Sequence, residues 1–109
     1  MKSFKEYARH IQEETALVIN QCHGLSFADF LGDEILKRAV VRSLEIIGEA
    51  VKNIPLEIKQ NYSGTDWKNI ARLRDRLIHH YFSIDYEIVW NIVEKHLPSL
   101  KSDIEKMIE

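Results

Sequence analysis

The segment from residue 34 to residue 53 constrains the fold more than any other part of the sequence. At about 100° per residue, most of its charged side chains fall into one narrow strip of a helix, and most of its other side chains are apolar. An apolar arc this wide must be covered on more than one side. We therefore expect this helix either to be central in a bundle or to pack on its own bundle and on a second subunit. The charged strip consists of Arg38, Arg42, Glu45, Glu49 and Lys52.

Three further stretches carry apolar residues at helical spacing, with short joints between them. They cover about residues 3–22, 65–80 and 85–108. Pro98 falls inside the last stretch and predicts a kink or a break just before it. With only four Gly and two Pro, a β-sandwich or barrel is disfavoured. The sequence predicts a single all-α domain over residues 1–109, folded as an antiparallel bundle of four to five helices.

Composition limits the classes of partner and compartment. The formal net charge of the 109 residues is -2, so no overall positive field holds nucleic acid, and any such contact must be local. The single cysteine, Cys22, cannot form an internal disulfide, which favours a reducing compartment, and we interpret it as a small core residue. No apolar run approaches the ~20 residues that span a membrane, and the charged N-terminal segment is unlike a signal peptide. We expect a cytoplasmic protein with no membrane partner.

Arg74 lies in the middle of the apolar side of the helix predicted near residues 65–80. A buried arginine is costly unless it is paired and hydrogen-bonded. One interpretation is a structural ion pair with Glu45 or Glu49 of the preceding long helix. The other is functional: a guanidinium held in a cleft would bind two oxygens of a phosphate through its planar fork.

Asp75 and His79 are four residues apart and share one face of the same helix. That spacing lets the carboxylate accept a hydrogen bond from the imidazole ring and orient it, and such a histidine can act as a general acid or base near neutral pH. The alternative is an exposed histidine that interacts with the helix dipole. His79 and the adjacent His80 point about 100° apart, so we expect no metal site here.

Helical geometry separates Arg74 from His79. The two residues lie about 140° apart in azimuth and ~7.5 Å apart along the axis, so one straight helix does not aim both at one point. Either the arginine side chain curls toward a cleft, or a second copy of the protein supplies the missing half of the site. Arg74 and Tyr81, seven residues apart, do fall on one face.

The segment RDRLIHHYF resembles the motif of the HepT branch of the HEPN superfamily. That motif is an Arg, a polar residue, three further residues, a His, any residue and a Tyr, and Arg74, Asp75, His79 and Tyr81 occupy these places in order. The segments RSLEIIGEAVKNIP and YFSIDYEIVWNIVEKHLPSL also match, so the similarity is clearest from about residue 35 to residue 100. All motif positions are intact.

The resemblance implies a helical bundle that dimerises and brings two Arg-His motifs to the interface. It implies the toxin of a prokaryotic toxin–antitoxin system, an endoribonuclease that needs neither metal nor cofactor. The implied partner is an MntA-like nucleotidyltransferase antitoxin, which silences the toxin by transferring AMP from ATP onto the motif tyrosine. By position, that tyrosine is Tyr81.

The chemistry of RNA cleavage suits these residues. RNA carries its own nucleophile, the 2′-OH, so no metal-activated water is required. In this interpretation His79 takes the 2′-OH proton or protonates the leaving 5′ oxygen, and Asp75 orients His79. Arg74 stabilises charge that develops on the phosphate.

Three further cations make the same helix locally basic. Lys68, Arg72 and Arg76 are candidate contacts to flanking phosphates, and a solvated basic face is the alternative. A second class of function also stays open, a non-catalytic HEPN binding module that binds nucleotide or assists a partner nucleotidyltransferase. A purely structural dimerisation bundle would give Arg74 no reason to interrupt an apolar stripe.

Overall fold

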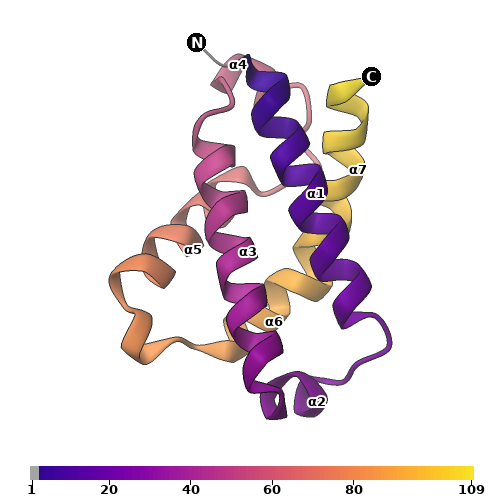
Figure 1. Ribbon diagram of the computed structural model, residues 1–109. Helices are drawn as coiled ribbons and strands as arrows, with labels where there is room; N and C mark the ends of the chain where they lie inside the picture. The colour runs from indigo at the N-terminus through magenta and orange to yellow at the C-terminus, as the bar shows by residue number, and fades with distance from the viewer. Residues whose placement is uncertain (1–2) are drawn as a thin grey trace.

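Helices make up most of the structure, a computed structural model in which residues 3–109 are described. The long helices are α1 (Phe4–Cys22), α3 (Glu34–Lys52), α5 (Trp67–His79) and α7 (Leu97–Ile108). The shorter segments are α2 (Phe27–Gly32), α4 (Leu56–Lys59), the 3-10 helix η1 (Tyr81–Ser83), α6 (Tyr86–Asn91) and the π-helix η2 (Ile92–His96). Residues 3–109 contain no β-strand, which confirms the predicted all-α class (Figure 1). No helix in this range has both the length and the hydrophobicity needed to cross a membrane.

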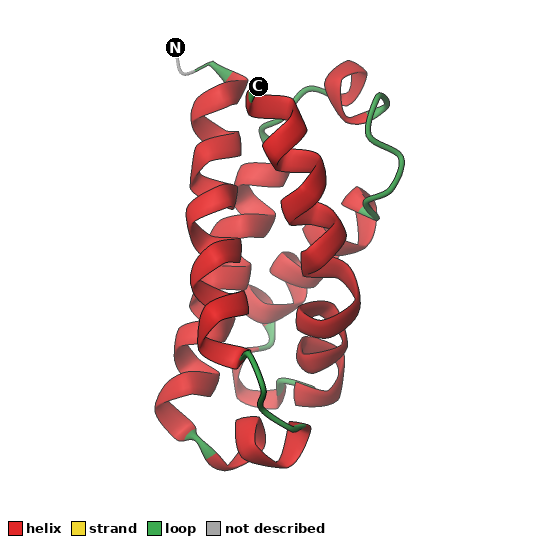
Figure 2. Cartoon of the chain, turned by 90° about the vertical axis from the view of Figure 1, so that its right-hand side faces the viewer, coloured by secondary structure: helices red, strands yellow, loops and turns green. Residues whose placement is uncertain are grey.

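The helix α3 is central in the arrangement. It packs on α1 along one side and on α5 along another, while α7 packs on the far side of α1 (Figure 1). The helices α1 and α3 run in opposite directions along the long axis of the molecule, whereas α5 is inclined to it (Figure 1 and Figure 2). The wide apolar arc of α3 is therefore covered on two sides within one chain, the first of the two alternatives that the sequence left open.

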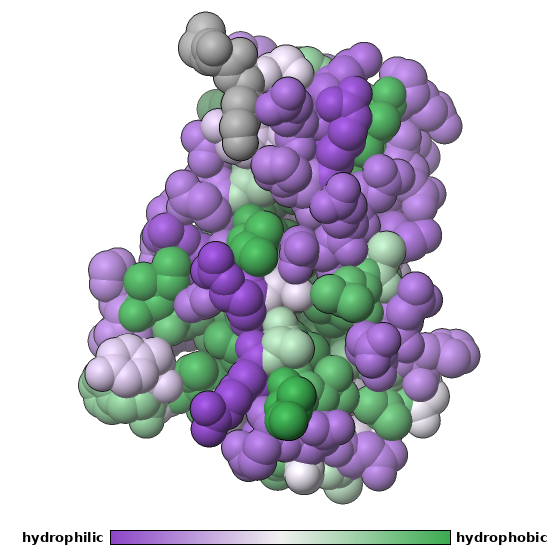
Figure 3. Space-filling view, viewed as in Figure 1, coloured by the Kyte–Doolittle hydropathy of each residue, from purple (hydrophilic) through white to green (hydrophobic). Residues whose placement is uncertain are grey.

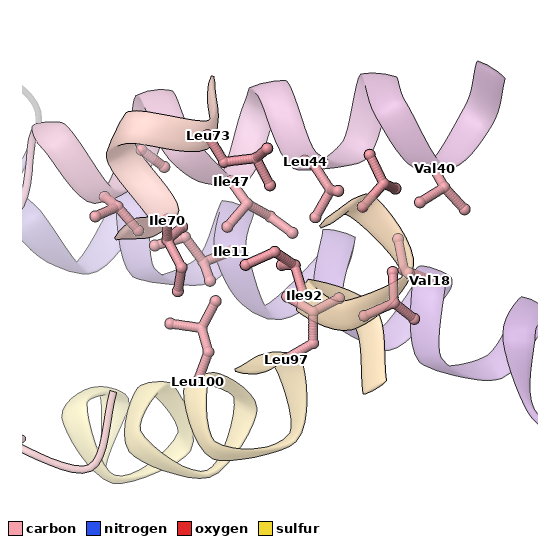
Figure 4. Packing of buried hydrophobic residues seen from close by; sticks show 14 of the residues in the cluster. Ile11, Val18, Val40, Leu44, Ile47, Ile70, Leu73, Ile92, Leu97 and Leu100 are labelled. Carbon is pink, nitrogen blue, oxygen red and sulfur yellow. The ribbon is translucent and has the colours of Figure 1, made fainter. Parts of the chain in front are cut away.

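The core lies where α1, α3, α5 and α7 face one another. Side chains from these helices interdigitate around Ile11, Ile47 and Leu100, which are all completely buried (Figure 4). Complete burial of a side chain of this size stabilises the fold by about 1.5–3 kcal/mol relative to exposure. Cys22 also belongs to this core, as predicted, and burial raises the pKa of its thiol.

The helix that carries Pro98 changes its geometry just before the proline. α6, η2 and α7 follow one another without a break, and the π-helical stretch η2 immediately precedes Leu97 and Pro98. Proline has no N–H to donate to the preceding turn and its ring clashes with that turn, so the helix widens there. The irregularity predicted before Pro98 is a π-helical segment within a continuous helix.

Asp66 defines the beginning of α5. Its side chain accepts a hydrogen bond from the backbone N–H of Asn69 at 3.2 Å, which satisfies one of the unpaired donors of the first turn. At the other end the helix stops at His79, and the chain turns through η1 toward α6. The motif segment therefore spans the last turns of α5 and the turn that follows it.

Candidate active site

Gly48 lets α5 approach α3 closely at Arg74. A Cβ atom on Gly48 would overlap the Cβ of Arg74 and lie 3.2 Å from the backbone oxygen of Ile70. Only a residue without a side chain fits there, so the stem of Arg74 rests on the backbone of α3. The glycine in the segment EIIGEA is thus part of the site, a role that the sequence analysis missed.

Arg74 is held by two carboxylates. Its Nη2 lies 2.8 Å from Oε2 of Glu49 on α3, and its Nη1 lies 3.0 Å from Oδ1 of Asp75. The ion pair with Glu49 is one of the two partners predicted from the sequence, whereas Glu45 pairs with Arg42 instead, at 3.5 Å. The Nε of Arg74 is buried and has no hydrogen-bond partner within the described residues. One guanidinium donor is therefore left unused.

Contrary to the prediction from the sequence, Asp75 does not orient His79. Its Oδ1 accepts hydrogen bonds from Nζ of Lys52 at 2.7 Å and from Arg74 at 3.0 Å, and no hydrogen bond joins it to His79 in residues 3–109. The hydrogen bond from Lys52, followed by that from Arg74, lowers the pKa of Asp75. Lys52 of α3 is a partner of this carboxylate that no pattern within α5 indicates.

His79 stands apart from Arg74. It is the last residue of α5 and is exposed, and no hydrogen bond or ion pair within residues 3–109 ties it to Arg74. The guanidinium of Arg74 is directed to Glu49 on α3. Both residues belong to the continuous helix α5, so their side chains leave its axis about 140° apart.

Tyr81 lies beyond the end of α5, in η1. The expectation that it shares a helix face with Arg74 is wrong, because the helix has already ended at His79. Its side chain is 75% exposed, and the neighbouring Phe82 is 76% exposed, with the two rings edge-to-face at 5.7 Å. The phenol is therefore open to a second macromolecule.

A hollow of about 230 Å³ lies beside Arg74, which we call the Arg74 hollow. Tyr7 and His10 of α1 and Arg42 of α3 line it together with Arg74. Nothing in the local sequence pattern connected α1 with the motif, because this contact depends on how α1 packs on α3. His10 and Arg42 are thus additional polar groups near the candidate arginine.

The three other cations of α5 are exposed and four residues apart, so they follow one another along one face of the helix. Lys68 lines an open hollow of about 820 Å³ together with Lys52 and Trp67. Arg72 and Arg76 line a different hollow, toward α6. The three cations of this basic face therefore border two separate hollows.

Comparison with known proteins assigns the chain to a family. A family model described as "Ribonuclease HepT-like" matches residues 4–107. The chain is 45% identical over 109 residues to a protein of Caldanaerobacter subterraneus subsp. tengcongensis named as a "Putative RNase", covering 100% of this chain and 97% of that protein. It is 42% identical over 106 residues to the "Probable ribonuclease HepT" of Thermococcus cleftensis, covering 97% and 96% of the two chains. No solved structure matches. The chain belongs to the HepT-like ribonuclease family.

Proposed function

We propose that this protein is a single-domain, cytoplasmic toxin that cleaves RNA endonucleolytically without a metal ion, with Arg74 and His79 as its catalytic residues. Membership of the HepT-like ribonuclease family supports the class of reaction. The observation that carries the proposal is the pairing of the Arg74 guanidinium. It forms an ion pair with Glu49 of α3, while its Nε is buried and unpaired beside a hollow. Leaving a buried donor unpaired costs about 1–3 kcal/mol, so a phosphate oxygen that accepts from it is favoured.

The proposed reaction is an attack of the ribose 2′-oxygen on the adjacent phosphorus. His79 either removes the 2′-OH proton while water protonates the leaving 5′ oxygen, or protonates the 5′ oxygen while water accepts the 2′-OH proton. The phosphorus–oxygen bond to the 5′ oxygen breaks, which leaves a cyclic phosphate and a 5′-hydroxyl. Arg74 turns into the Arg74 hollow and stabilises the negative charge on the phosphate oxygens. Asp75 acts as a positioning residue for Arg74, to which it is hydrogen-bonded, rather than for His79.

A second copy of the chain completes the site in this proposal. Because Arg74 and His79 are separated within one chain, the partner chain supplies one of these two residues to each site. Exposed apolar side chains near the motif provide surface for a dimer, since Phe82 is 76% exposed and Ile35, at the start of α3, is 81% exposed. Figure 3 shows hydrophobic side chains gathered in the lower half of the face that carries α3 and α5.

Tyr81 is the proposed site of control by an MntA-like nucleotidyltransferase antitoxin. Its phenol is exposed, so a partner enzyme can reach it. An AMP group attached there would place a bulky negative charge at the end of α5, where it would repel the RNA backbone. Mass spectrometry after incubation with ATP and the partner should find an AMP adduct on Tyr81 and none on Tyr81→Phe. Adducts only at other residues would contradict this part of the proposal.

The decisive test is cleavage of RNA by the purified protein in EDTA. The wild type should cut RNA, and Arg74→Ala and His79→Ala should each reduce the rate by about 10²–10³-fold while circular dichroism remains that of a helical fold. Arg9→Ala, an exposed arginine on α1, is the matched control and should retain full activity. A wild type that binds ATP but leaves RNA intact would instead support the non-catalytic binding module.

A further inference from the structure

A groove follows the side of α5 that faces α6 and η2. It consists of two adjoining hollows of about 290 Å³ and 220 Å³. The two hollows share Leu73, Arg76 and Ile88, so they form one continuous depression, which we call the α5–α6 groove. One end reaches His80, which directly follows the proposed catalytic His79.

The floor of the α5–α6 groove is apolar. Leu73 and Leu77 of α5 form one side of it, and Ile84 and Ile88 form the other. Ile88 of α6 is 38% exposed. The face of a nucleobase can make apolar contacts with an aliphatic floor of this kind.

The rim of the groove is cationic on the α5 side. Arg72 and Arg76 are one helical turn apart, ~6 Å along the axis, and both are exposed. Arg76 makes no ion pair within residues 3–109, and Arg72 makes only a 3.5 Å hydrogen bond to Asn69. The carboxylate on the rim, Asp85, is engaged in capping α6. The two guanidinium groups are therefore available for phosphates.

Across the groove, η2 contributes a further group. Its last residue, His96, lines the same hollow as Arg72 and Arg76. π-helical segments occur frequently at functional sites. Here the segment places the imidazole of His96 in the hollow that Arg72 and Arg76 line, and Asn91, the last residue of α6, adds an amide. Both walls thus present groups that can bind an RNA backbone.

We propose that the α5–α6 groove binds a nucleotide of single-stranded RNA next to the scissile phosphate. The base lies on the apolar floor, and Arg72 and Arg76 bind the phosphates on either side of it. Because the groove leads to His80, a strand that follows it reaches His79 at the end of α5. Bases in a duplex are stacked inside the helix and cannot reach the floor, so the groove selects unpaired RNA. This inference rests on the proposed ribonuclease function and names its substrate class.

Binding can be measured separately from cleavage in a His79→Ala background. The affinity of labelled oligouridylate is followed by fluorescence anisotropy at several salt concentrations. The pair Arg72→Gln and Arg76→Gln should weaken binding about tenfold and reduce the slope of log affinity against log salt by about 1.4, since each phosphate contact to a single strand contributes about 0.7. The matched control is Arg9→Gln with Lys106→Gln, which removes two exposed cations from α1 and α7 and should leave affinity and slope unchanged.

The floor is tested with Ile88→Ser. This variant should weaken binding of oligouridylate several-fold but leave binding of inorganic tripolyphosphate, which has no base, unchanged. Equal weakening by the control pair, equal affinity for duplex and single-stranded RNA, or wild-type affinity after loss of both arginines would overturn the proposal. Failure of the groove would leave cleavage that depends on Arg74 and His79 intact, whereas failure of the ribonuclease proposal would not affect these binding results.

Discussion

The charged residues around Arg74 form one connected network of ion pairs rather than separate pairs. Asp75 accepts from both Lys52 and Arg74, and Arg74 also pairs with Glu49. The arginine is 23% exposed, so its contacts are screened less by solvent than those of a surface residue. Its orientation is therefore determined by α3 as much as by its own helix.

Lys52→Met should raise the pKa of Asp75, because its strongest hydrogen bond is lost. The carboxylate pKa is lowered in the folded state, so its contribution to stability is present above the ordinary aspartate pKa and disappears as the pH falls through the lowered value. The variant should thus lose less stability than the wild type on acidification. Carboxyl NMR titration measures the shift, and Lys101→Met, which breaks a distant pair with Glu105, is the control. An unchanged midpoint for Asp75 would contradict the contact.

Arg74→Lys should lose most of the ribonuclease activity although the positive charge is kept. An ammonium group has no planar fork, so it cannot serve Glu49, Asp75 and a phosphate in the geometry of a guanidinium. We expect a rate about 10–100-fold below the wild type, with a thermal midpoint within a few degrees of it. RNA cleavage and thermal unfolding measure the two effects, with Arg9→Lys as the control. Full activity in Arg74→Lys would show that the fork is not needed.

At the scale of elements, α3 and α5 approach each other closely. This close approach occurs at Gly48, where the stem of Arg74 lies directly on the helix backbone. Close packing of the two helices aligns Arg74 with Glu49, which follows Gly48 in sequence. The same contact therefore supports both the fold and the candidate site.

Gly48→Ala should destabilise the protein. Alanine would gain about 1 kcal/mol in helix propensity, but the added Cβ overlaps the stem of Arg74, and overpacking of this kind costs about 1–3 kcal/mol. We expect a net loss of up to about 2 kcal/mol in urea unfolding, together with reduced activity because α5 is displaced. Gly32→Ala, where no atom lies within 4 Å, is the control and should change stability by less than about 0.5 kcal/mol. Equal stability of the two variants would argue against close contact at Gly48.

At the scale of the whole molecule, Arg74 and His79 point to different sides of α5. A symmetric dimer resolves this separation if each site takes Arg74 from one protomer and His79 from its partner. Such a dimer would also cover the apolar side chains exposed near the motif, Phe82 among them. Interface burial would add stability to a chain of 109 residues, which is small for a domain with a single core.

Mixing two inactive variants tests this arrangement. Arg74→Ala and His79→Ala, combined in equal amounts and allowed to exchange subunits, should recover about a quarter of the wild-type activity. Half of the dimers would be mixed, and each mixed dimer would hold one intact site. Light scattering should give twice the mass of one chain for every sample. No recovery after demonstrated exchange would mean that each site uses one chain only.

The sequence by itself determined the helical class and the identity of the motif, whereas the central position of α3 was one of two alternatives until its packing was known. Periodicity depends on local geometry, so it located the long helices and marked Arg74 as the charged residue on an apolar face. Tertiary structure decided which groups surround that residue. Lys52, Glu49 and Gly48 reach Arg74 and Asp75 only because α3 packs against α5, and no pattern within α5 specifies the angle of that contact. The sequence predicted the wrong partner for Asp75 and did not indicate the α5–α6 groove. Both have the same cause, because ion pairs and cavities depend on neighbours that are distant in sequence.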